Sequence, residues 1–526
     1  MDLFIKLSML FVFFATTIGI GLYCRRHATD VNGFVLGGRS VGPWLTAFAY
    51  GTSYFSAVVF VGYAGQFGWK FGIASTWAGI GNSLIGSLMA WAFLGRRTRV
   101  MTQHLSSATM PQFFSARFLS PALKTASSAI IFIFLIPYTA SLYNGLSRLF
   151  GMAFDIDYSV CVIVMAILTA IYVIAGGYMA TAINDFVQGI IMIIGIIAVI
   201  SAVLKGQGGF LEALNKLGHV SDPAVSQTPG VFASFFGPDL LSLVGVVLLT
   251  SLGTWGLPQM VGKFYAIKNE EAISKGTIIS TFFAIVVAGG CYFLGGFGRL
   301  YGDSITYGAN GAPVYDSIVP QMLSGLPDVI VAIVIILVLS ASMSTLSSLV
   351  LTSSSTLTLD MIVPLSKKSM DEKKKMLCIR VLIVFFIVIS AAIAILQAKS
   401  QVTFIAQLMG ISWGALAGAF LAPFLWGLYS KKITKSAVWA SFVTGVGIML
   451  ANMACTFAGV TFISAYFSSP INAGVLSMVT GLIIVPVVSL FTKKMDSRMV
   501  DDMFECYDRT ITVRASTSLE DTKAKK

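Results

Sequence analysis

Twelve hydroxyl side chains crowd the second half of the apolar stretch 329–359. At about 1.5 Å per residue, this stretch is long enough for a helix to cross a hydrocarbon core of roughly 30 Å. Hard cations such as Na⁺ prefer oxygen ligands, so the cluster indicates a cation-binding surface at membrane depth. Hydroxyls in membrane helices also bond to their own i−4 carbonyl or serve as small residues at helix contacts, and that alternative stays open. The spacing places on or beside one helical face Ala341, Ser344, Thr345, Ser347 and Ser348.

A second informative residue is Asp185, which lies just inside an otherwise apolar segment. An ionisable side chain within a span costs roughly 2.5–3.5 kcal/mol on insertion scales, so it usually faces the protein interior and has a partner. No Lys or Arg lies near Asp185 in the sequence, and therefore a bound cation or a proton would have to offset that cost. The alternative is an interfacial aspartate that caps the helix N-terminus.

The composition is typical of a polytopic membrane protein. Of 526 residues, 56% are hydrophobic and only 11% are charged, where a soluble protein has about a quarter charged residues. The formal charge of +12 indicates basic cytoplasmic loops, since no basic, aromatic-rich patch predicts nucleic-acid binding. The six cysteines have no paired spacing, and no nucleophile–base set or phosphate loop occurs. We therefore expect neither an enzyme nor a bound cofactor.

Thirteen apolar segments have spanning length, which predicts an all-α membrane protein with about 13 transmembrane helices. Basic residues gather in alternate loops, Lys263 among them, and this asymmetry predicts an outer N-terminus and a cytoplasmic C-terminus. We expect one transmembrane domain over 1–495 and a mobile tail without apolar periodicity over 496–526. The segments are 2–23, 42–66, 74–95, 121–150, 157–177, 182–204, 237–257, 274–298, 326–359, 377–397, 402–428, 434–457 and 470–491.

Two of these segments, the second and the seventh, are interrupted near the middle by glycine, proline and polar residues. The interruptions fall at 49–57 and at 250–259, five spans apart. Two repeats with an odd number of spans have opposite topology, and broken helices at corresponding places in inverted halves indicate a midplane binding site. Gly and Pro also kink membrane helices without any such role, so the pattern alone leaves that alternative open.

Together these features resemble the sodium:solute symporter family, which includes bacterial proline, pantothenate and sialic acid transporters and animal sodium–glucose transporters. The resemblance extends to about residue 495 and is carried by three motifs, at Phe34–Pro43, Gly176–Gln188 and Met343–Ser348. It implies a LeuT-like fold of two inverted five-helix repeats plus extra helices. The repeats would lie at about 42–204 and 237–428.

The resemblance also implies site residues. The main Na⁺ site would use the carbonyls of Thr52, Phe55 and Ala341 and the hydroxyls of Ser344 and Thr345. A second Na⁺ site, present in some members, would use Asp185 with Ser344, Ser347 and Ser348. The residues expected to contact the solute are Ser53, Ser56, Tyr138, Ser141, Trp255 and Gln259, of which Tyr138 and Trp255 could equally be packing aromatics.

The implied function is Na⁺-coupled import of a small organic solute across the cell membrane by alternating access, with Na⁺ as the coupling ion. Proline-transporting members carry an Asp where this chain has Tyr54, whereas Gly256–Gln259 looks more like pantothenate permeases. The expected solute is therefore an amino acid such as proline or a carboxylate such as pantothenate. Proton coupling through Asp185 is the main alternative. A channel would need a pore-lining filter that the sequence lacks, and a sensor would need a larger signalling module than the tail.

Overall fold

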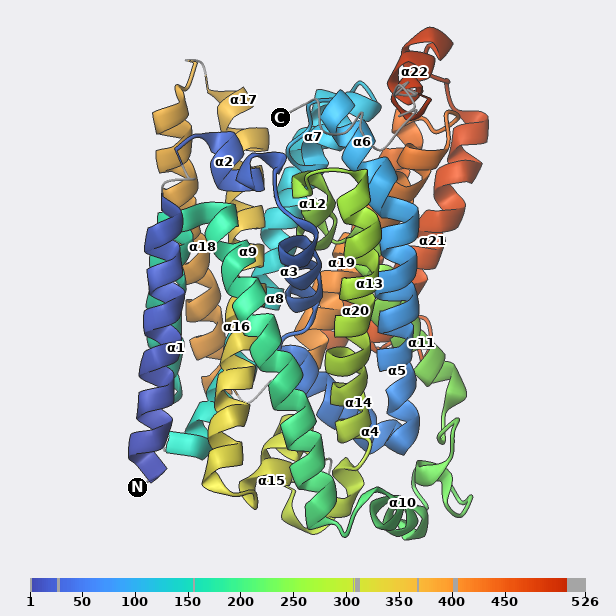
Figure 1. Cartoon of the computed structure of the whole chain (residues 1–526). Helices are drawn as coiled ribbons and strands as arrows, with labels where there is room; N and C mark the ends of the chain where they lie inside the picture. The colour runs from blue at the N-terminus through green and yellow to red at the C-terminus, as the bar shows by residue number, and fades with distance from the viewer. Residues whose placement is uncertain are drawn as a thin grey trace, which may run out of the picture.

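The computed structural model describes residues 2–25, 29–154, 157–305, 307, 313–366, 369–400 and 405–508. Helices dominate this part of the chain, and most of the long ones run along one axis of the molecule (Figure 1). Within it, ten helices are long and apolar enough to cross a membrane, or eleven if the bent pair 240–256 and 258–266 forms one span. The predicted all-α polytopic fold is confirmed, and the count of thirteen spans stays a prediction.

Two of the ten helical stretches are much longer than one span: α9 (Tyr158–Gly206) covers nearly all of two predicted segments, and Val58–His104 contains the end of one predicted segment and the whole of the next. Helix α9 has 49 residues, or about 73 Å at 1.5 Å per residue. It breaks at Gly177, where φ of 55° and ψ of −145° suit glycine alone. The stretch Val58–His104 turns in the same way at Gly72, where φ is 62°.

The interruption predicted in the second segment is a break in the helix. Helix α3 (Pro43–Tyr54) ends at Phe55, which is extended with φ of −79° and ψ of 118°. The chain then resumes as the π-helical segment η3 (Val58–Tyr63) and α4 (Ala64–Phe71).

The second break has nearly the same backbone geometry. Helix α11 (Leu240–Ser251) and the 3₁₀ segment η8 (Leu252–Gly256) end at Leu257, where φ is −86° and ψ is 120°. A new helix, α12 (Pro258–Ala266), follows at a bend of 46°. The predicted end of this segment at residue 257 coincides with the break, and proline in the first helical position starts the new helix.

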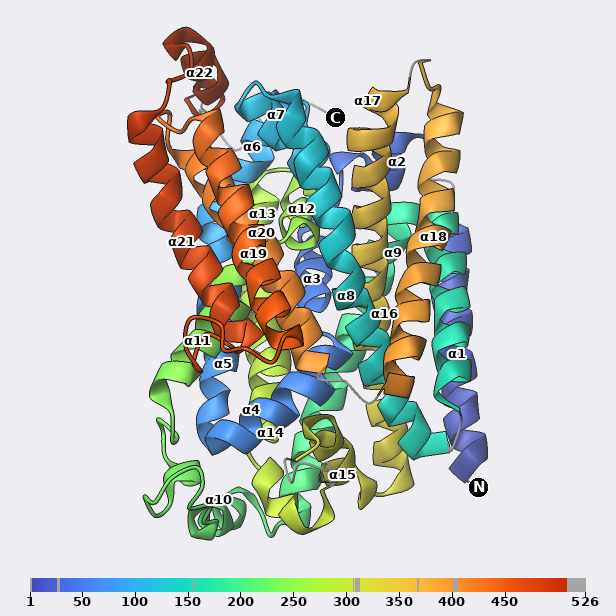
Figure 2. The same ribbon diagram turned by 180° about the vertical axis from the view of Figure 1, so that it is seen from behind.

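Helix α16 (Asp328–Thr356) packs against α1, α3, α8, α9 and α18 (Figure 1). Helices α19, α20 and α21 pack together as a second group, on the side of the molecule away from α1 and α18 (Figure 2). Helices not yet given bounds are α1 (Asp2–Cys24), α2 (Val31–Leu36), α5 (Thr76–Gly81), α6 (Arg96–His104), α7 (Met110–Arg117), α8 (Pro121–Phe154), α10 (Phe210–His219), α13 (Glu270–Ala284), α14 (Gly290–Gly295), α15 (Ile318–Ser324), α17 (Val363–Leu365), α18 (Glu372–Ser400), α19 (Ile405–Tyr429), α20 (Lys435–Phe457) and α21 (Pro470–Phe491).

The first part of the predicted tail is a short packed helix, so the expectation of a wholly mobile tail is wrong. Helix α22 (Ser497–Phe504) lies at the same end of the bundle as α6 and α7, opposite the N-terminal end of α1 (Figure 1). The buried face of this helix consists of Val500, Met503 and Phe504. This apolar pattern is too short to be recognised from the sequence. Residues 509–526 of the tail lie outside the described residues.

Candidate functional site

Helix α16 places Ser344 and Thr345 against the break that follows α3. The Thr345 hydroxyl oxygen lies 3.0 Å from the carbonyl oxygen of Thr52 and 3.3 Å from that of Phe55. It also lies 3.0 Å from the carbonyl oxygen of Ala341. The Ser344 hydroxyl lies 3.3 Å and 3.2 Å from the carbonyls of Thr52 and Ala341. All five residues predicted for the main Na⁺ site therefore lie together, and all are fully buried.

The number of protons in this cluster decides what it can bind. Three of its oxygens are carbonyls, and each of the two hydroxyls has a single proton, so Thr345 cannot donate to three carbonyls at once. Five oxygens that share two protons leave lone pairs facing one another in a buried site, and a hard cation satisfies them. Among the described residues, no group of three or more His, Cys, Asp or Glu side chains could hold a metal. The uncharged oxygens here fit Na⁺.

A buried ion pair lies one helical turn farther along α16. The Lys263 ammonium of α12 lies 3.8 Å from Oδ2 of Asp185 on α9, and the two side chains are 4% and 0% exposed. The same ammonium donates a 2.9 Å hydrogen bond to the Ser348 hydroxyl and lies 5.2 Å from the ring centroid of Tyr178. One ion pair thus connects α9, α12 and α16.

Two interpretations from the sequence are wrong at this pair. Asp185 does not cap a helix, because the second part of α9 begins at Gly177, two turns earlier, and the carboxylate is fully buried. Lys263 is not a loop residue, because α12 continues past the break and carries it into the interior. Distance in the sequence hid this partner, since 78 residues separate the two charges.

The other residues predicted for a second Na⁺ site already have bonds. Ser347 donates to the carbonyl of Ser344 at 2.9 Å within its own helix. Ser348 accepts from Lys263, and its hydroxyl also lies 2.9 Å from that of Ser53. The second Na⁺ site stays a prediction. In the structure, the Lys263 ammonium lies beside Asp185 and Ser348, where that second Na⁺ is expected.

Three of the predicted solute residues have their polar atoms bonded within the protein. Ser53 donates to the carbonyl of Ala49 at 2.6 Å, and Ser141 donates to that of Tyr138 at 2.6 Å. The Trp255 indole N–H donates to the carbonyl of Ile85 at 2.9 Å. These contacts indicate packing or helix-stabilising roles for the three side chains.

The other three predicted solute residues are Ser56, Tyr138 and Gln259, which are buried. Among the described residues, the Gln259 amide has no hydrogen-bond partner, and the Tyr138 hydroxyl has only Ser56 and Trp413 close by, in geometry too poor for a standard hydrogen bond. Buried polar groups are rarely left without partners, so these atoms are the better candidates to face a solute. The sequence analysis missed Trp413, whose indole N–H joins this set. Its ring centroid lies 5.6 Å from that of Tyr54 and 5.9 Å from that of Tyr138. No sequence signal distinguishes Trp413 from other tryptophans in apolar helices.

The basic end of the bundle is the end where α6 lies, with Arg96, Arg97 and Arg99 (Figure 1). There, Arg39 connects the two broken helices. Its guanidinium donates to the carbonyls of Tyr265 at 3.1 Å and of Ser107, and the backbone N–H of Lys268 donates to the carbonyl of Val41 at 3.0 Å. Burial, with a smaller contribution from Arg99, lowers the pKa of Arg39 to about 10, so it stays charged at neutral pH. The start of α3 and the end of α12 are thereby held together.

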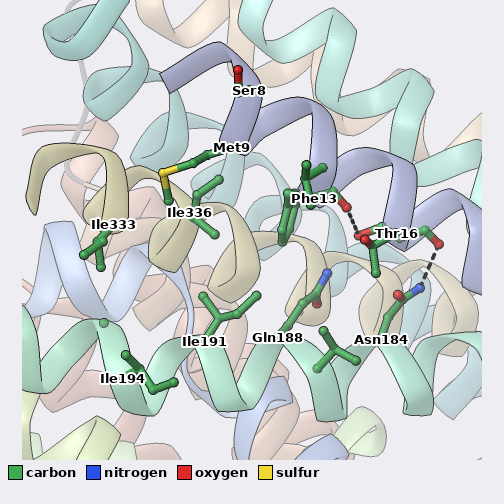
Figure 3. Close-up of a pocket in the computed structure, with 14 residues that line it drawn as sticks. Ser8, Met9, Phe13, Thr16, Asn184, Gln188, Ile191, Ile194, Ile333 and Ile336 are labelled. Carbon is green, nitrogen blue, oxygen red and sulfur yellow. Dashed lines mark hydrogen bonds between the residues drawn. The ribbon is translucent and has the colours of Figure 1, made fainter. Parts of the chain in front are cut away.

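A separate cavity of about 490 Å³ lies between α1, α9 and α16 (Figure 3). Its lining is mainly apolar and includes Phe13, Ile191 and Ile336. Asn184 donates to the carbonyl of Thr17 at 3.3 Å, and the Gln188 amide has no hydrogen-bond partner among the described residues. Because an apolar lining does not suit a cation and no predicted site residue lines this cavity, we place neither the ion nor the solute there.

Comparisons with known proteins agree with this geometry. The chain is 27% identical over 486 residues to the osmoregulated proline transporter OpuE of Bacillus subtilis, covering 92% of this chain and 94% of that protein. It is 29% identical over 450 residues to a sodium/proline symporter of Staphylococcus aureus, covering 84% of each chain.

Among solved structures, a Na⁺-coupled sialic acid symporter in a substrate-bound, outward-open state shares the fold, with a TM-score of 0.72 at 15% identity. The alignment covers 94% of this chain and 99% of that one, and it confirms the predicted LeuT-like fold. These proteins are transporters rather than enzymes. Because the family model matches residues 34–445, the chain belongs to the sodium:solute symporter family.

Proposed function

We propose that this chain imports a small organic solute together with Na⁺ by alternating access. The observation that carries the proposal is the convergence of five uncharged oxygens, from the break after α3 and from α16, at Ser344 and Thr345. An inside-negative membrane adds about 2.3 kcal/mol per charge per 100 mV to inward Na⁺ movement. A neutral or zwitterionic solute that moves with the ion is thereby concentrated.

The ion would couple the two processes by joining two elements. Na⁺ at this site bridges α16 to the unwound backbone at Thr52 and Phe55, and it therefore favours the conformation in which they touch. Release of Na⁺ to the inside removes the bridge and allows one group of helices to move against the other. We assign the binding step to the outward-facing state.

The solute we favour is a neutral or zwitterionic amino acid such as proline. Two relatives of known name are proline transporters, and all six predicted solute residues are uncharged at neutral pH. Ser56, Tyr138 and Gln259 supply donors and acceptors for such a solute. A carboxylate such as pantothenate is the second candidate, because the sequence Gly256–Gln259 resembles the corresponding segment of pantothenate permeases.

We place the chain in the cell membrane with its N-terminus outside and its tail in the cytoplasm. The support is the basic end of the bundle, where α6 carries Arg96, Arg97 and Arg99, since cytoplasmic loops are rich in Lys and Arg. A reporter enzyme that is active only in the cytoplasm, fused after residue 526, should be active. An inactive reporter in a correctly inserted protein would reverse the assigned orientation.

A stability screen of the purified protein tests the proposed function. Proline, other amino acids, pantothenate, short monocarboxylates, sialic acid and sugars are each added in NaCl and in KCl at one fixed pH. A ligand that binds the folded state raises its melting temperature by mass action. We expect stabilisation by one solute class in NaCl only. Equal stabilisation in both salts would overturn Na⁺ coupling and favour a proton at Asp185.

A further inference from the structure

The buried pair of Asp185 and Lys263 has no part in the proposed function, and yet it lies one turn from the main Na⁺ site. Neither carboxylate oxygen of Asp185 has a hydrogen-bond partner among the described residues. Its compensation is the Lys263 ammonium at 3.8 Å. An uncompensated carboxylate is strongly disfavoured at this depth, so the ammonium has the electrostatic role that a bound cation would otherwise fill.

The surroundings of the ammonium match those of a bound cation. Lys263 donates to the Ser348 hydroxyl at 2.9 Å and faces the ring of Tyr178 at 5.2 Å. Ser348 and Asp185 are two of the residues predicted to hold a second Na⁺. With Lys263 present, the position is neutral overall, because one negative and one positive charge face each other.

A Na⁺ ion beside this pair would gain little net attraction, because the repulsion from the Lys263 ammonium offsets the attraction of the Asp185 carboxylate. Two like charges 4 Å apart at an effective dielectric constant of about 20 repel by an amount equal to roughly 1,000-fold in binding, so the ammonium cancels most of the affinity for Na⁺ that the carboxylate would give alone. The main site is different, because its five ligands are uncharged and no ammonium in the described part of the chain bonds to them. Na⁺ therefore has one favourable position on α16 and one that is already filled.

We propose that Lys263 supplies the second cation of this transporter from within the chain, so that the protein binds one Na⁺, at Ser344 and Thr345, and the position beside Asp185 accepts Na⁺ only when the ammonium is removed. This inference rests on the proposed function, since it concerns the number of coupling ions. It makes Lys263 a determinant of ion stoichiometry.

The structure provides room for such an exchange. A cavity of about 50 Å³ lies beside Lys263 and is lined by Gln259, Thr352 and Ser355. The Gln259 amide has no hydrogen-bond partner among the described residues. A site that holds a water needs only about 10–15 Å³ and two to four polar partners, so a neutral side chain at position 263 leaves space for Na⁺ and water.

The experiment is equilibrium binding of ²²Na⁺ to the purified full-length protein, without any solute. The variants are Lys263→Met, Lys263→Arg, Asp185→Asn, the double variant Lys263→Met/Asp185→Asn, and Thr345→Ala. We expect one Na⁺ per molecule in the native protein, in Lys263→Arg and in the double variant. We expect two in Lys263→Met, because the carboxylate then lacks its internal cation.

Two results would overturn the inference. One is a native protein that binds two Na⁺ and loses one in Asp185→Asn, since the carboxylate then binds Na⁺ beside Lys263. The other is a folded Lys263→Met protein that still binds one Na⁺. If Lys263→Met does not fold, the native count compared with Asp185→Asn remains decisive, because one ion in both supports the inference.

Failure of the proposed function gives a different result. A native protein that binds no Na⁺, or whose single Na⁺ is unaffected by Thr345→Ala, contradicts the main site itself. The inference about Lys263 fails with the main site intact when the native count is two and Thr345→Ala removes only one of them.

Discussion

Ser344 and Ser348 lie one helical turn apart on α16, and the structure surrounds them in opposite ways. At Ser344, carbonyls exposed by the break after α3 meet two hydroxyls, and every ligand is uncharged. At Ser348, the Asp185 carboxylate on α9 meets the Lys263 ammonium on α12. Among the described residues, no cationic side chain bonds to the first position, whereas the Lys263 ammonium lies at the second.

The difference shows how a membrane protein can tune ion binding without changing the helix that carries it. The same hydroxyl chemistry on α16 serves both positions, and the neighbouring elements decide the outcome. Where the neighbour is unwound backbone, lone pairs converge and favour a mobile ion. Where the neighbour is a lysine, the positive charge is fixed to the chain and moves only when its helix moves.

The largest expected effect comes from breaking the ion pair. Asp185→Asn leaves a buried ammonium uncompensated, and we expect it to lower the free energy of unfolding by about 3–5 kcal/mol. The double variant Lys263→Met/Asp185→Asn should recover most of that loss, because it leaves no unpaired charge. A double-mutant cycle of thermal stability in detergent measures the coupling. Equal losses in single and double variants would show that the pair does not interact.

The break in α9 at Gly177 lies about two turns before Asp185 of the ion pair. A side chain at Gly177, which has a positive φ, would place Cβ 2.7 Å from the Phe34 carbonyl oxygen. We expect Gly177→Ala to reduce stability by about 1–3 kcal/mol. The matched control is Gly447→Ala in α20, where a Cβ meets no atom within 4 Å. Comparable melting temperatures for both variants would contradict the strain at Gly177.

At the uncharged position, the effect should appear in Na⁺ binding rather than in folding. Thr345→Ala removes the hydroxyl that lies within 3.3 Å of three carbonyls, and we expect at least about a tenfold rise in the Na⁺ concentration for half-maximal binding, or about 1.4 kcal/mol. Thr345→Ser keeps the hydroxyl and should change the Na⁺ concentration for half-maximal binding little. Sodium titrations of melting temperature measure both, and an unchanged Thr345→Ala titration would remove this residue from the site.

The smallest effect is expected at a surface pair that is closer together than the buried one. Lys431 and Asp501 lie 2.6 Å apart, and their side chains are 52% and 60% exposed. Water screens such a pair, so Lys431→Ala should change stability by less than about 1 kcal/mol. Thermal unfolding of Lys431→Ala, measured in parallel with Asp185→Asn, tests whether the burial of a charge pair matters more to stability than the distance between its two charges. A loss as large as that of Asp185→Asn would reverse this ranking.

Much of the candidate site could be predicted from the sequence because its signals are local. The hydroxyl cluster on α16 and both helix breaks depend on residue types within about ten positions, and the structure places Ser344 and Thr345 against the first break. The same local information misplaced Lys263, since a lysine that follows a break looks like a loop residue. It also missed Trp413, whose neighbours Tyr54 and Tyr138 lie on other helices.

The sequence by itself determined the membrane class, the helical architecture and the hydroxyl-rich face of α16, because apolar length and hydroxyl spacing follow from consecutive residues. Only the tertiary structure decided which charge compensates Asp185. A buried carboxylate requires a counter-charge, but electrostatics acts through space, and the nearest cation comes from a helix 78 residues away. The position that looked ready for a second ion therefore holds the chain's own ammonium.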